Sequence, residues 1–184
     1  MQGDLRAPTT VADCRDGEHR FSKQPRDSVR LLAGLGVEGD AHAGRTVRHR
    51  SRLRTQAGAP NLRQVHLLGL ETLERLRREG FEVAPGDLGE NLTTRDVDLH
   101  ALPRGTLLRV GEAELELTGL RNPCGQLDDF QPGLTRALLG RGEQGEVLLR
   151  GGVMAVVLRS GEVRPGDRID VTLPAPPHAE LERV

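Results

Sequence analysis

Cys124 is the residue of this sequence with the clearest capacity for reactive chemistry. It lies in the segment Arg121-Asn-Pro-Cys-Gly-Gln126, where the proline before it and the glycine after it predict a sharp turn outside any regular element. Arg121 comes three residues earlier, and its guanidinium would lower the pKa of the thiol if the two groups are neighbours in space. A thiolate here could be a nucleophile, a sulfur carrier or a ligand for a soft metal, and the alternative is a buried, inert cysteine. Cys14 has no comparable setting and is expected to be structural or incidental.

A glycine-rich segment, Gly36-Val-Glu-Gly-Asp-Ala-His-Ala-Gly44, combines flexible backbone with two groups that can move protons. Its three glycines allow positive φ angles and a close approach of the backbone to a ligand. Asp40 and His42 could orient that ligand or transfer a proton to it. The alternative is a glycine-rich surface loop with a solvated acid and a solvated histidine.

The residues that follow form a local positive field in a chain whose net charge is only −1. No acidic residue occurs between Asp40 and Glu71, whereas six arginines do: Arg45, Arg48, Arg50, Arg52, Arg54 and Arg63. Guanidinium groups bind phosphate or carboxylate oxygens in pairs, so a small anionic ligand is one interpretation. A solvated loop or a non-specific polyanion contact is the other. Because the chain has no Trp or Tyr and only three Phe, far apart in sequence, we expect no nucleic-acid binding by base stacking.

Two further patterns carry weaker signals. In Pro85-Gly-Asp-Leu-Gly-Glu-Asn-Leu-Thr-Thr94 a fixed bend precedes Asn91, whose amide could read the edge of a heterocycle or close its own turn. The six histidines lack zinc-site spacing, although a site built from Asp40, His42 and His49 is conceivable. A phosphate-binding P-loop, a serine nucleophile elbow and a dinucleotide fingerprint are all absent from the sequence.

The elements that would position these residues are mostly short strands. Alternation in 112–118 places Ala113, Leu115 and Leu117 on one face, and 107–110 precedes it as the other half of a hairpin. A continuous apolar run over 153–158 predicts a strand buried on both faces, and strands are also expected at 168–173, 29–32 and 64–68. Leucines three apart predict a helix over 70–78 that ends near Gly80, and 134–139 predicts a shorter one. The predicted fold class is therefore mainly β, barrel-like, with a few short helices.

Length and composition place further limits on the chain. Its 184 residues suit one domain over 1–184, with loose tails at 1–10 and 174–184. Because aromatic residues make up only 2% of the chain, Leu, Val and Ala must build the core. No apolar run approaches the ~18 residues of a membrane span, and the N-terminus lacks a signal pattern. With two cysteines and no disulfide framework, a cytoplasmic location is expected.

At these positions the sequence resembles the MOSC family, named after the C-terminal domain of molybdenum cofactor sulfurase. The resemblance covers about residues 28–173 as an ordered set of blocks, each weak alone. The blocks are Gly39-Asp-Ala-His-Ala-Gly44, Arg63-Gln-Val-His-Leu-Leu68, Pro85-Gly-Asp-Leu-Gly-Glu-Asn-Leu92, Leu102-Pro-Arg-Gly105, Arg121-Asn-Pro-Cys124 and Gly161-Glu-Val-Arg-Pro-Gly-Asp167.

The resemblance implies a strand-rich, barrel-like domain and a role with the molybdenum cofactor. It implies that Cys124 ligates molybdenum, as in relatives that reduce N-hydroxylated compounds, or carries sulfur as a persulfide, as proposed for sulfurase-type relatives. Asp40 and His42 are then candidate proton donors. The residues expected to hold the cofactor are Gly39, Asp40, His42, Gly44, Arg45, Asn91 and Arg121, with Arg45 or a neighbour on its phosphate.

Two departures from larger relatives shape the functional hypothesis. The chain is too short to hold a pyridoxal-phosphate desulfurase domain, and it lacks flavin, haem and iron–sulfur motifs. We therefore expect a reductase of N-hydroxylated small molecules that draws electrons from a separate protein. The alternatives are a persulfide or cofactor carrier without redox turnover, and a plain small-molecule-binding barrel.

Overall fold

The computed structural model describes residues 7–18, 20–46 and 58–184, and its largest element is an eight-stranded sheet. Every neighbouring pair in that sheet is antiparallel except β5 and β6, which are parallel. In spatial order the strands are β13 (Ile169–Thr172), β7 (Leu107–Val110), β8 (Ala113–Leu120), β11 (Val153–Arg159), β5 (Val65–Gly69), β6 (Leu92–Arg95), β1 (Thr9–Arg15) and β2 (Gln24–Arg26).

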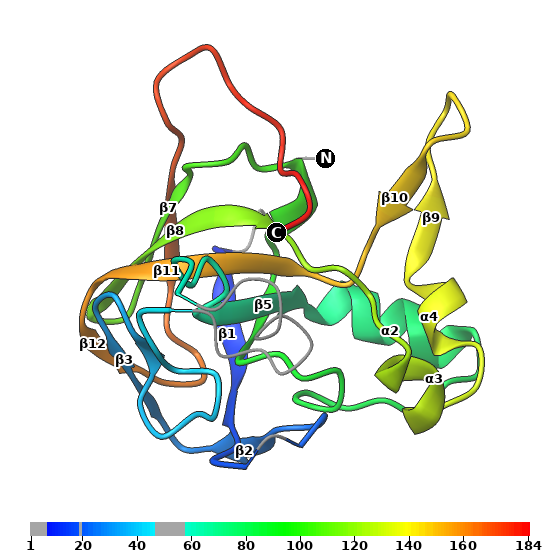
Figure 1. Cartoon of the computed structure of the whole chain (residues 1–184), viewed down its shortest axis with the longest axis horizontal. Coiled ribbons are helices and arrows are strands. Elements are labelled where there is room, and N and C mark those ends of the chain that lie inside the picture. Colours follow the sequence, from blue (N-terminus) through cyan, green and yellow to red (C-terminus); the bar gives the residue numbers. More distant parts are fainter. Residues whose placement is uncertain (1–6, 19, 47–57) are drawn as a thin grey trace.

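Two smaller sheets and four short helical segments complete the described fold (Figure 1). One sheet has the order β12 (Gly161–Val163), β3 (Val29–Leu32), β4 (Gly36–Val37), and the other pairs β10 (Val147–Leu149) with β9 (Leu139–Arg141). The helices are α2 (Leu70–Arg78), α3 (Gln126–Phe130), α4 (Leu134–Ala137) and the 3₁₀ segment η1 (Leu99–Ala101).

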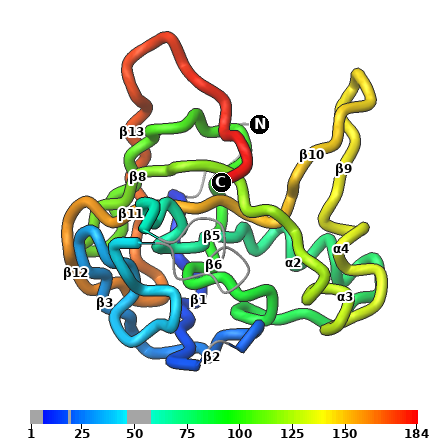
Figure 2. Tube along the Cα trace, viewed as in Figure 1, coloured from blue at the N-terminus to red at the C-terminus, as the bar shows by residue number. Residues whose placement is uncertain are grey.

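The large sheet curls until β13, at one end, reaches the start of β1, next to the other end, which makes the molecule barrel-like without a continuous hydrogen-bonded ring (Figure 2). A single antiparallel bridge joins Thr9 to Arg168. Beside it, the amide of Thr10 donates to the carbonyl of Asp167 at 2.9 Å, and the amide of Ile169 donates to Pro8 at 2.8 Å. The predicted fold class, mainly β and barrel-like, is confirmed.

The barrel core is aliphatic, as the composition required. Alternation works as expected in β8, where Ala113, Leu115 and Leu117 are fully buried. Strand β11 is buried along most of its length, as predicted. Its last two residues are exposed, and Leu158 is 45% exposed, so the burial of both faces does not extend to the end of the strand.

Helix α2 crosses between the parallel strands β5 and β6, as a parallel connection requires. It buries Leu70, Leu73 and Leu76 in a second aliphatic cluster that also contains Leu127 and Leu134 of α3 and α4. The chain then turns at Gly80, which has a φ of 96°. The predicted helix over 134–139 is shorter in the structure, because residues from Leu139 onward pair with β10 instead.

The C-terminal segment corrects an expectation, because 174–184 is not a loose tail. The amide of Leu120 donates to the carbonyl of Glu182 at 2.7 Å, and Leu181 is only 8% exposed. A Cβ at Gly119 would lie 2.4 Å from the Glu182 carbonyl oxygen, so the approach needs a glycine there. Backbone hydrogen bonds hold this segment in place, and its proline-rich composition gives no sign of them in the sequence. At the other end β1 already begins at Thr9, and residues 1–6 lie outside the described residues.

Among the residues that the structure describes, no helix has both the length and the apolar character needed to cross a membrane.

Candidate functional site

Cys124 lies in the irregular loop between β8 and α3, as the flanking proline and glycine predicted. The residue is half-buried, and its Sγ lies 3.6 Å from the side-chain oxygen of Gln126. Its carbonyl oxygen accepts from the amide of Leu127 at 3.0 Å and from the hydroxyl of Thr135 at 3.4 Å. Helices α3 and α4 therefore both hold the loop that presents the thiol.

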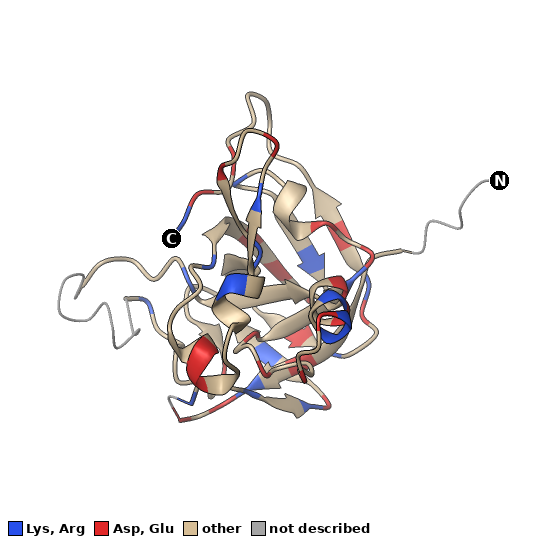
Figure 3. Cartoon of the chain, turned by 90° about the vertical axis from the view of Figure 1, so that its right-hand side faces the viewer, with Lys and Arg blue, Asp and Glu red and all other residues tan. Residues whose placement is uncertain are grey.

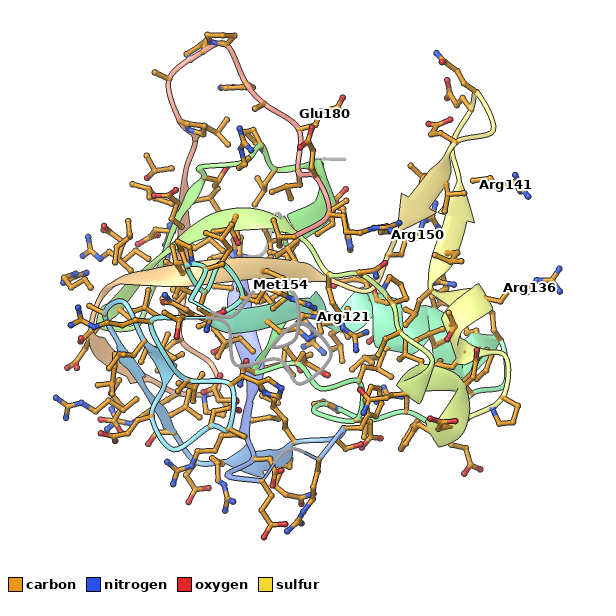
Figure 4. All side chains as sticks on the ribbon, in the orientation of Figure 1. Arg121, Arg136, Arg141, Arg150, Met154 and Glu180 are labelled. Atoms are coloured by element: carbon orange, nitrogen blue, oxygen red, sulfur yellow. The ribbon has the colours of Figure 1, made fainter. Side chains whose placement is uncertain are left out.

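Arg121, at the other end of this loop, places a buried cation near Cys124. Its amide donates to the carbonyl of Gly152 at 3.0 Å, and its guanidinium carbon lies 5.9 Å from the centre of the Phe21 ring. Burial lowers the pKa of Arg121, while the charges of Cys124 and Glu90 oppose that shift. Its Nη1 is buried and has no hydrogen-bond partner among the described residues. Figure 4 shows Arg121 inside the fold, close to β11 and Met154.

Asn91 connects the segments around the site through its side-chain amide. Its Oδ1 accepts from the amide of His66 at 3.1 Å, while its Nδ2 donates to the carbonyl of Cys14 at 3.2 Å and to Oδ2 of Asp40 at 3.1 Å. The amide therefore does not close its own turn. It fixes strand β5, strand β1 and the glycine-rich loop relative to one another.

Asp40 is the centre of a buried ionic group. Its Oδ2 lies 2.7 Å from Nζ of Lys23, and its Oδ1 accepts from the amide of His42 at 2.9 Å and lies 3.2 Å from Nδ1 of that ring. Burial favours the neutral carboxyl, but the hydrogen bonds from His42 and the charge of Lys23 outweigh it and hold the pKa of Asp40 below its ordinary value. Burial lowers the pKa of Lys23, against the attraction of Asp40. Asp40 is therefore ionised at neutral pH.

His66 links this group to the Arg121 loop. Its Nε2 lies 2.8 Å from the carbonyl oxygen of Gly151, so that nitrogen carries the hydrogen. Burial and the nearby charge of Arg121 lower the pKa of His66 well below its ordinary value, so the ring is neutral. A Cβ on Gly152 would lie 2.6 Å from Nε2 of His66. Gly152 is thus what allows the β10–β11 connection to cross the imidazole.

Glu90 is a second buried carboxyl in the same region. Its Oε1 accepts from the amide of Gly86 at 2.8 Å and from the hydroxyl of Thr93 at 3.1 Å. Burial raises its pKa, and Oε2 has no partner among the described residues.

Hydrogen bonds join three of the predicted site residues, Asn91, Asp40 and His42, and connect them to His66. Arg121 lies near enough for its charge to act on His66, and the charge of Cys124 acts on Arg121 in turn. The sequence interpretation missed Lys23 and Glu90 as members of this group. His66 belongs to the predicted strand over 64–68, to the six histidines that lack zinc-site spacing and to one resemblance block, but the sequence gives it no site role. Lys23 did carry a signal, since it is the sole lysine among 26 basic residues.

The remaining predicted residues have other surroundings. Gly39 has a φ of 73°. A Cβ added to Gly39 would lie 2.9 Å from Nη1 of Arg15, so the arginine side chain packs against this glycine. Gly44 is held within the protein, with its carbonyl accepting from Asn61 at 3.0 Å. Arg45 is exposed. Four of the six arginines and His49 lie outside the described residues: Arg48, Arg50, Arg52 and Arg54.

Cys14 and the zinc hypothesis can be assessed from the same geometry. Cys14 is fully buried, and burial, reinforced by the charge of Glu90, raises the pKa of its thiol to about 12, as suits a structural cysteine. Within residues 7–18, 20–46 and 58–184, no cluster of three or more His, Cys, Asp or Glu side chains is arranged to hold a metal ion.

Comparisons with known proteins agree with this fold. The profile of the MOSC domain matches residues 40–170. Among solved structures, YuaD from Bacillus subtilis is similar with a TM-score of 0.73 and 23% identity, over 91% of this chain and 97% of that one. YiiM from Escherichia coli has a TM-score of 0.61 and 21% identity, over 92% and 72% of the two chains. YiiM from Geobacillus stearothermophilus has a TM-score of 0.60 and 18% identity, over 95% of this chain and 77% of that one. No curated protein gives a significant match.

Since the profile spans most of the sequence, the chain belongs to the MOSC domain family, which is associated with molybdenum cofactor binding. The solved structures, all below 25% identity, establish the fold.

Proposed function

We propose that this chain binds the molybdenum cofactor with Cys124 as a ligand of the metal, and that it reduces N-hydroxylated small molecules. The observation that carries the proposal is a half-buried thiol in the same loop as a buried guanidinium, Arg121, whose Nη1 lacks a partner among the described residues. A thiolate is a soft donor of the kind that such a metal accepts, and a buried cation favours an anionic group beside it.

The residues present fit the cofactor. Cys124 would hold the metal, and Arg121 would donate from Nη1 to an anionic atom of the bound group. The exposed side chain of Arg45 suits the cofactor's phosphate, because guanidinium forks bind phosphate oxygens in pairs. When bound, the cofactor would supply two-electron redox chemistry at its metal.

The proposed reaction converts R–NH–OH, two protons and two electrons into R–NH₂ and water. The N–O bond breaks, one proton goes to the nitrogen and the other to the departing hydroxide. Because Asp40 is ionised and paired with Lys23, we assign it to orienting His42 rather than to donating a proton. His42, whose side chain is 25% exposed, delivers the proton.

Metal analysis tests this assignment directly. Wild type, Cys124→Ala and Cys14→Ala are purified from a host that makes the molybdenum cofactor, and molybdenum is measured by plasma mass spectrometry. We expect near-stoichiometric molybdenum in wild type and in Cys14→Ala, and its loss in Cys124→Ala with an unchanged circular dichroism spectrum. Molybdenum retained by a folded Cys124→Ala protein would refute the ligand role.

The persulfide carrier is the second candidate, because it would use the same half-buried thiol. Cyanide-releasable sulfur measured on the same samples separates the two functions. Sulfur that depends on Cys124 in a protein without molybdenum would favour the carrier, and molybdenum without releasable sulfur would favour the reductase.

A further inference from the structure

A two-stranded arm projects from the body of the molecule (Figures 1 and 2). The arm consists of β9, β10 and the turn between them, and it returns to the body at Gly151, beside His66. Its two strands form a sheet of their own, and neither pairs with any other strand of the described fold. A two-stranded ribbon by itself is marginally stable in water, so further strands would stabilise the arm.

Strand β10 has a free edge. Within the arm, the amide of Arg150 donates to the carbonyl of Leu138 at 2.9 Å. Backbone groups alternate in direction along an antiparallel strand, so those of Leu148 also face β9. The amide and carbonyl groups of Val147 and Leu149 therefore point to the free edge, where no described strand pairs with them. Unpaired backbone groups in such a row are a template for another strand.

One face of the arm carries exposed aliphatic side chains. Register pairs Leu139 with Leu149 and Arg141 with Val147, and alternation places all four side chains on this face. Leu139 is 39% exposed and Val147 is 59% exposed. A strand added at the free edge would extend this face, and aliphatic side chains on the added strand would bury those of β10.

The opposite face carries one charge of each sign, because Glu146 directly precedes β10 and Arg150 directly follows it. Figure 4 shows Arg141 and Arg150 pointing to opposite sides of the arm. The carboxylate of Glu146 lies over Gly142 of the turn, and the guanidinium of Arg150 lies over Gly140 of β9. Neither charged group forms an ion pair with any described residue. Each therefore lacks a partner of opposite sign within its own arm.

A second copy of the arm matches all of these features. If β10 pairs antiparallel with β10 of another copy about a two-fold axis at Leu148, Val147 of each copy lies opposite Leu149 of the other. Glu146 of each copy then lies opposite Arg150 of the other, and two-fold symmetry makes each pair occur twice. The free backbone groups form the hydrogen-bonded pairs, the aliphatic faces become continuous, and each carboxylate meets a guanidinium.

We propose that the free edge of β10 is a homodimer interface, in which two copies of the chain form a four-stranded sheet in the order β9, β10, β10, β9. Acidic and basic residues are interspersed on this side of the molecule, which suits a second copy better than a partner of one charge sign (Figure 3). The exposed charged residues here include Asp128, Asp129, Arg136, Arg141 and Glu143. A two-fold interface needs a surface that is complementary to itself. The pairing does not depend on the proposed reaction.

Charge reversal tests the register. Sedimentation velocity at low salt, over a series of protein concentrations, compares wild type with Glu146→Arg, Arg150→Glu and the double variant Glu146→Arg/Arg150→Glu. The two arms bury less than a standard interface of about 1,600 Å², so we expect a wild-type Kd of about 10–100 µM. Each single variant should weaken the dimer about tenfold, because two like-charged pairs replace two opposite ones, and the double variant should return to within about threefold of wild type. Arg26→Glu, at an exposed arginine of β2, is the control.

A second test targets the backbone. Val147→Pro removes an amide at the free edge and leaves the pairing with β9 in place, as proline on an edge strand allows, so it should abolish the dimer without changing the circular dichroism spectrum. Glu146→Arg also removes the bond that Glu146 accepts from the amide of Gln144 at 3.1 Å, but the double variant loses this bond too, so restored dimerisation excludes it as the cause. A wild type that stays monomeric at every concentration, a double variant as weak as the single ones, or a dimer that Val147→Pro leaves intact would overturn the interface.

Discussion

At the scale of single residues, the interior of this protein holds more charge than its aliphatic composition suggests. Lys23 and Asp40 form a buried ion pair, and Glu90, His66 and Arg121 lie nearby. Buried ionic groups are costly unless paired, and removing one partner leaves an uncompensated charge. Such a group is therefore better explained as a means of orienting side chains than as a source of stability.

Asp13 is a buried carboxyl outside this group, and it makes stability depend on pH. Neither of its oxygens has a partner among the described residues, and burial, with a smaller effect of Asp167, raises its pKa from 3.8 to about 7. Between these values the unfolded chain releases the proton and the native protein keeps it. The contribution of Asp13 to stability is therefore lost as the pH rises from about 4 to about 7.

We predict that Asp13→Asn removes this pH dependence. Urea unfolding at pH 5 and pH 8 should show the variant gaining about 3 kcal/mol on wild type between the two pH values. The exposed Asp27, as Asp27→Asn, provides the control for a charge change at the surface. A gain of the same size at both pH values would contradict the assigned pKa.

At the scale of elements, local patterns predicted some parts of the fold and not others. Alternation, an apolar run and the leucine period located β7, β8, β11 and α2, because each buries one face or both along several residues. Alternation also located β13, although only Ile169 of that strand is buried. Strands β9, β10 and β12 have three residues each, too few for a periodic signal. Their pairing depends on partners elsewhere in the chain.

The same distinction holds for the site. Its motif residues were predictable where turn chemistry marked them, as at Cys124 between a proline and a glycine. Lys23 and His66 come from segments distant from Glu90 and Asn91, and only folding brings the four together. No local sequence pattern predicts that residues from distant segments will meet in one site.

Gly152 and Gly166 form a matched pair for testing why a glycine is needed at the start of β11, beside His66. Both have a φ of 95°, but a Cβ on Gly152 would lie 2.4 Å from the Leu67 carbonyl, whereas nothing lies within 4 Å at Gly166. We expect Gly166→Ala to lose about 1–2 kcal/mol of unfolding free energy from the left-handed conformation alone. Gly152→Ala should lose at least about 2 kcal/mol more, because the backbone must also shift.

Urea unfolding of both variants and their molybdenum content check this prediction. The clash at Gly152 also involves the ring of His66, so Gly152→Ala should bind less molybdenum while Gly166→Ala binds as wild type does. Equal losses of stability would show that φ, and not the crossing of His66, makes a glycine necessary at 152.

At the scale of the whole molecule, the C-terminal segment is part of the barrel's support. Leu181 enters the main core cluster, and the backbone that follows it, at Glu182 and Val184, pairs with Leu120, next to Arg121. The segment therefore stabilises the end of β8 from which the Cys124 loop departs.

We predict that Leu181→Ala destabilises the protein by about 2–3 kcal/mol, as expected for a buried leucine. Leu173→Ala, at a side chain that is 51% exposed, is the control and should change stability by less than about 0.5 kcal/mol. Chemical denaturation gives the energies, and faster hydrogen exchange at the Leu120 amide in Leu181→Ala would locate the effect. Exchange unchanged at that amide would mean that the segment does not support β8.

The bridge between Thr9 and Arg168 has a consequence for how the protein is made. The two halves of that contact are separated by most of the chain, so a ribosome must release nearly the whole sequence before the barrel can close. Contacts of such long range also make folding slow. Until then β7, which lies between β13 and β8 in the finished sheet, keeps one edge unpaired. The nascent chain therefore carries an unpaired strand edge until β13 is made, and its exposure to chaperones in that interval is set by topology.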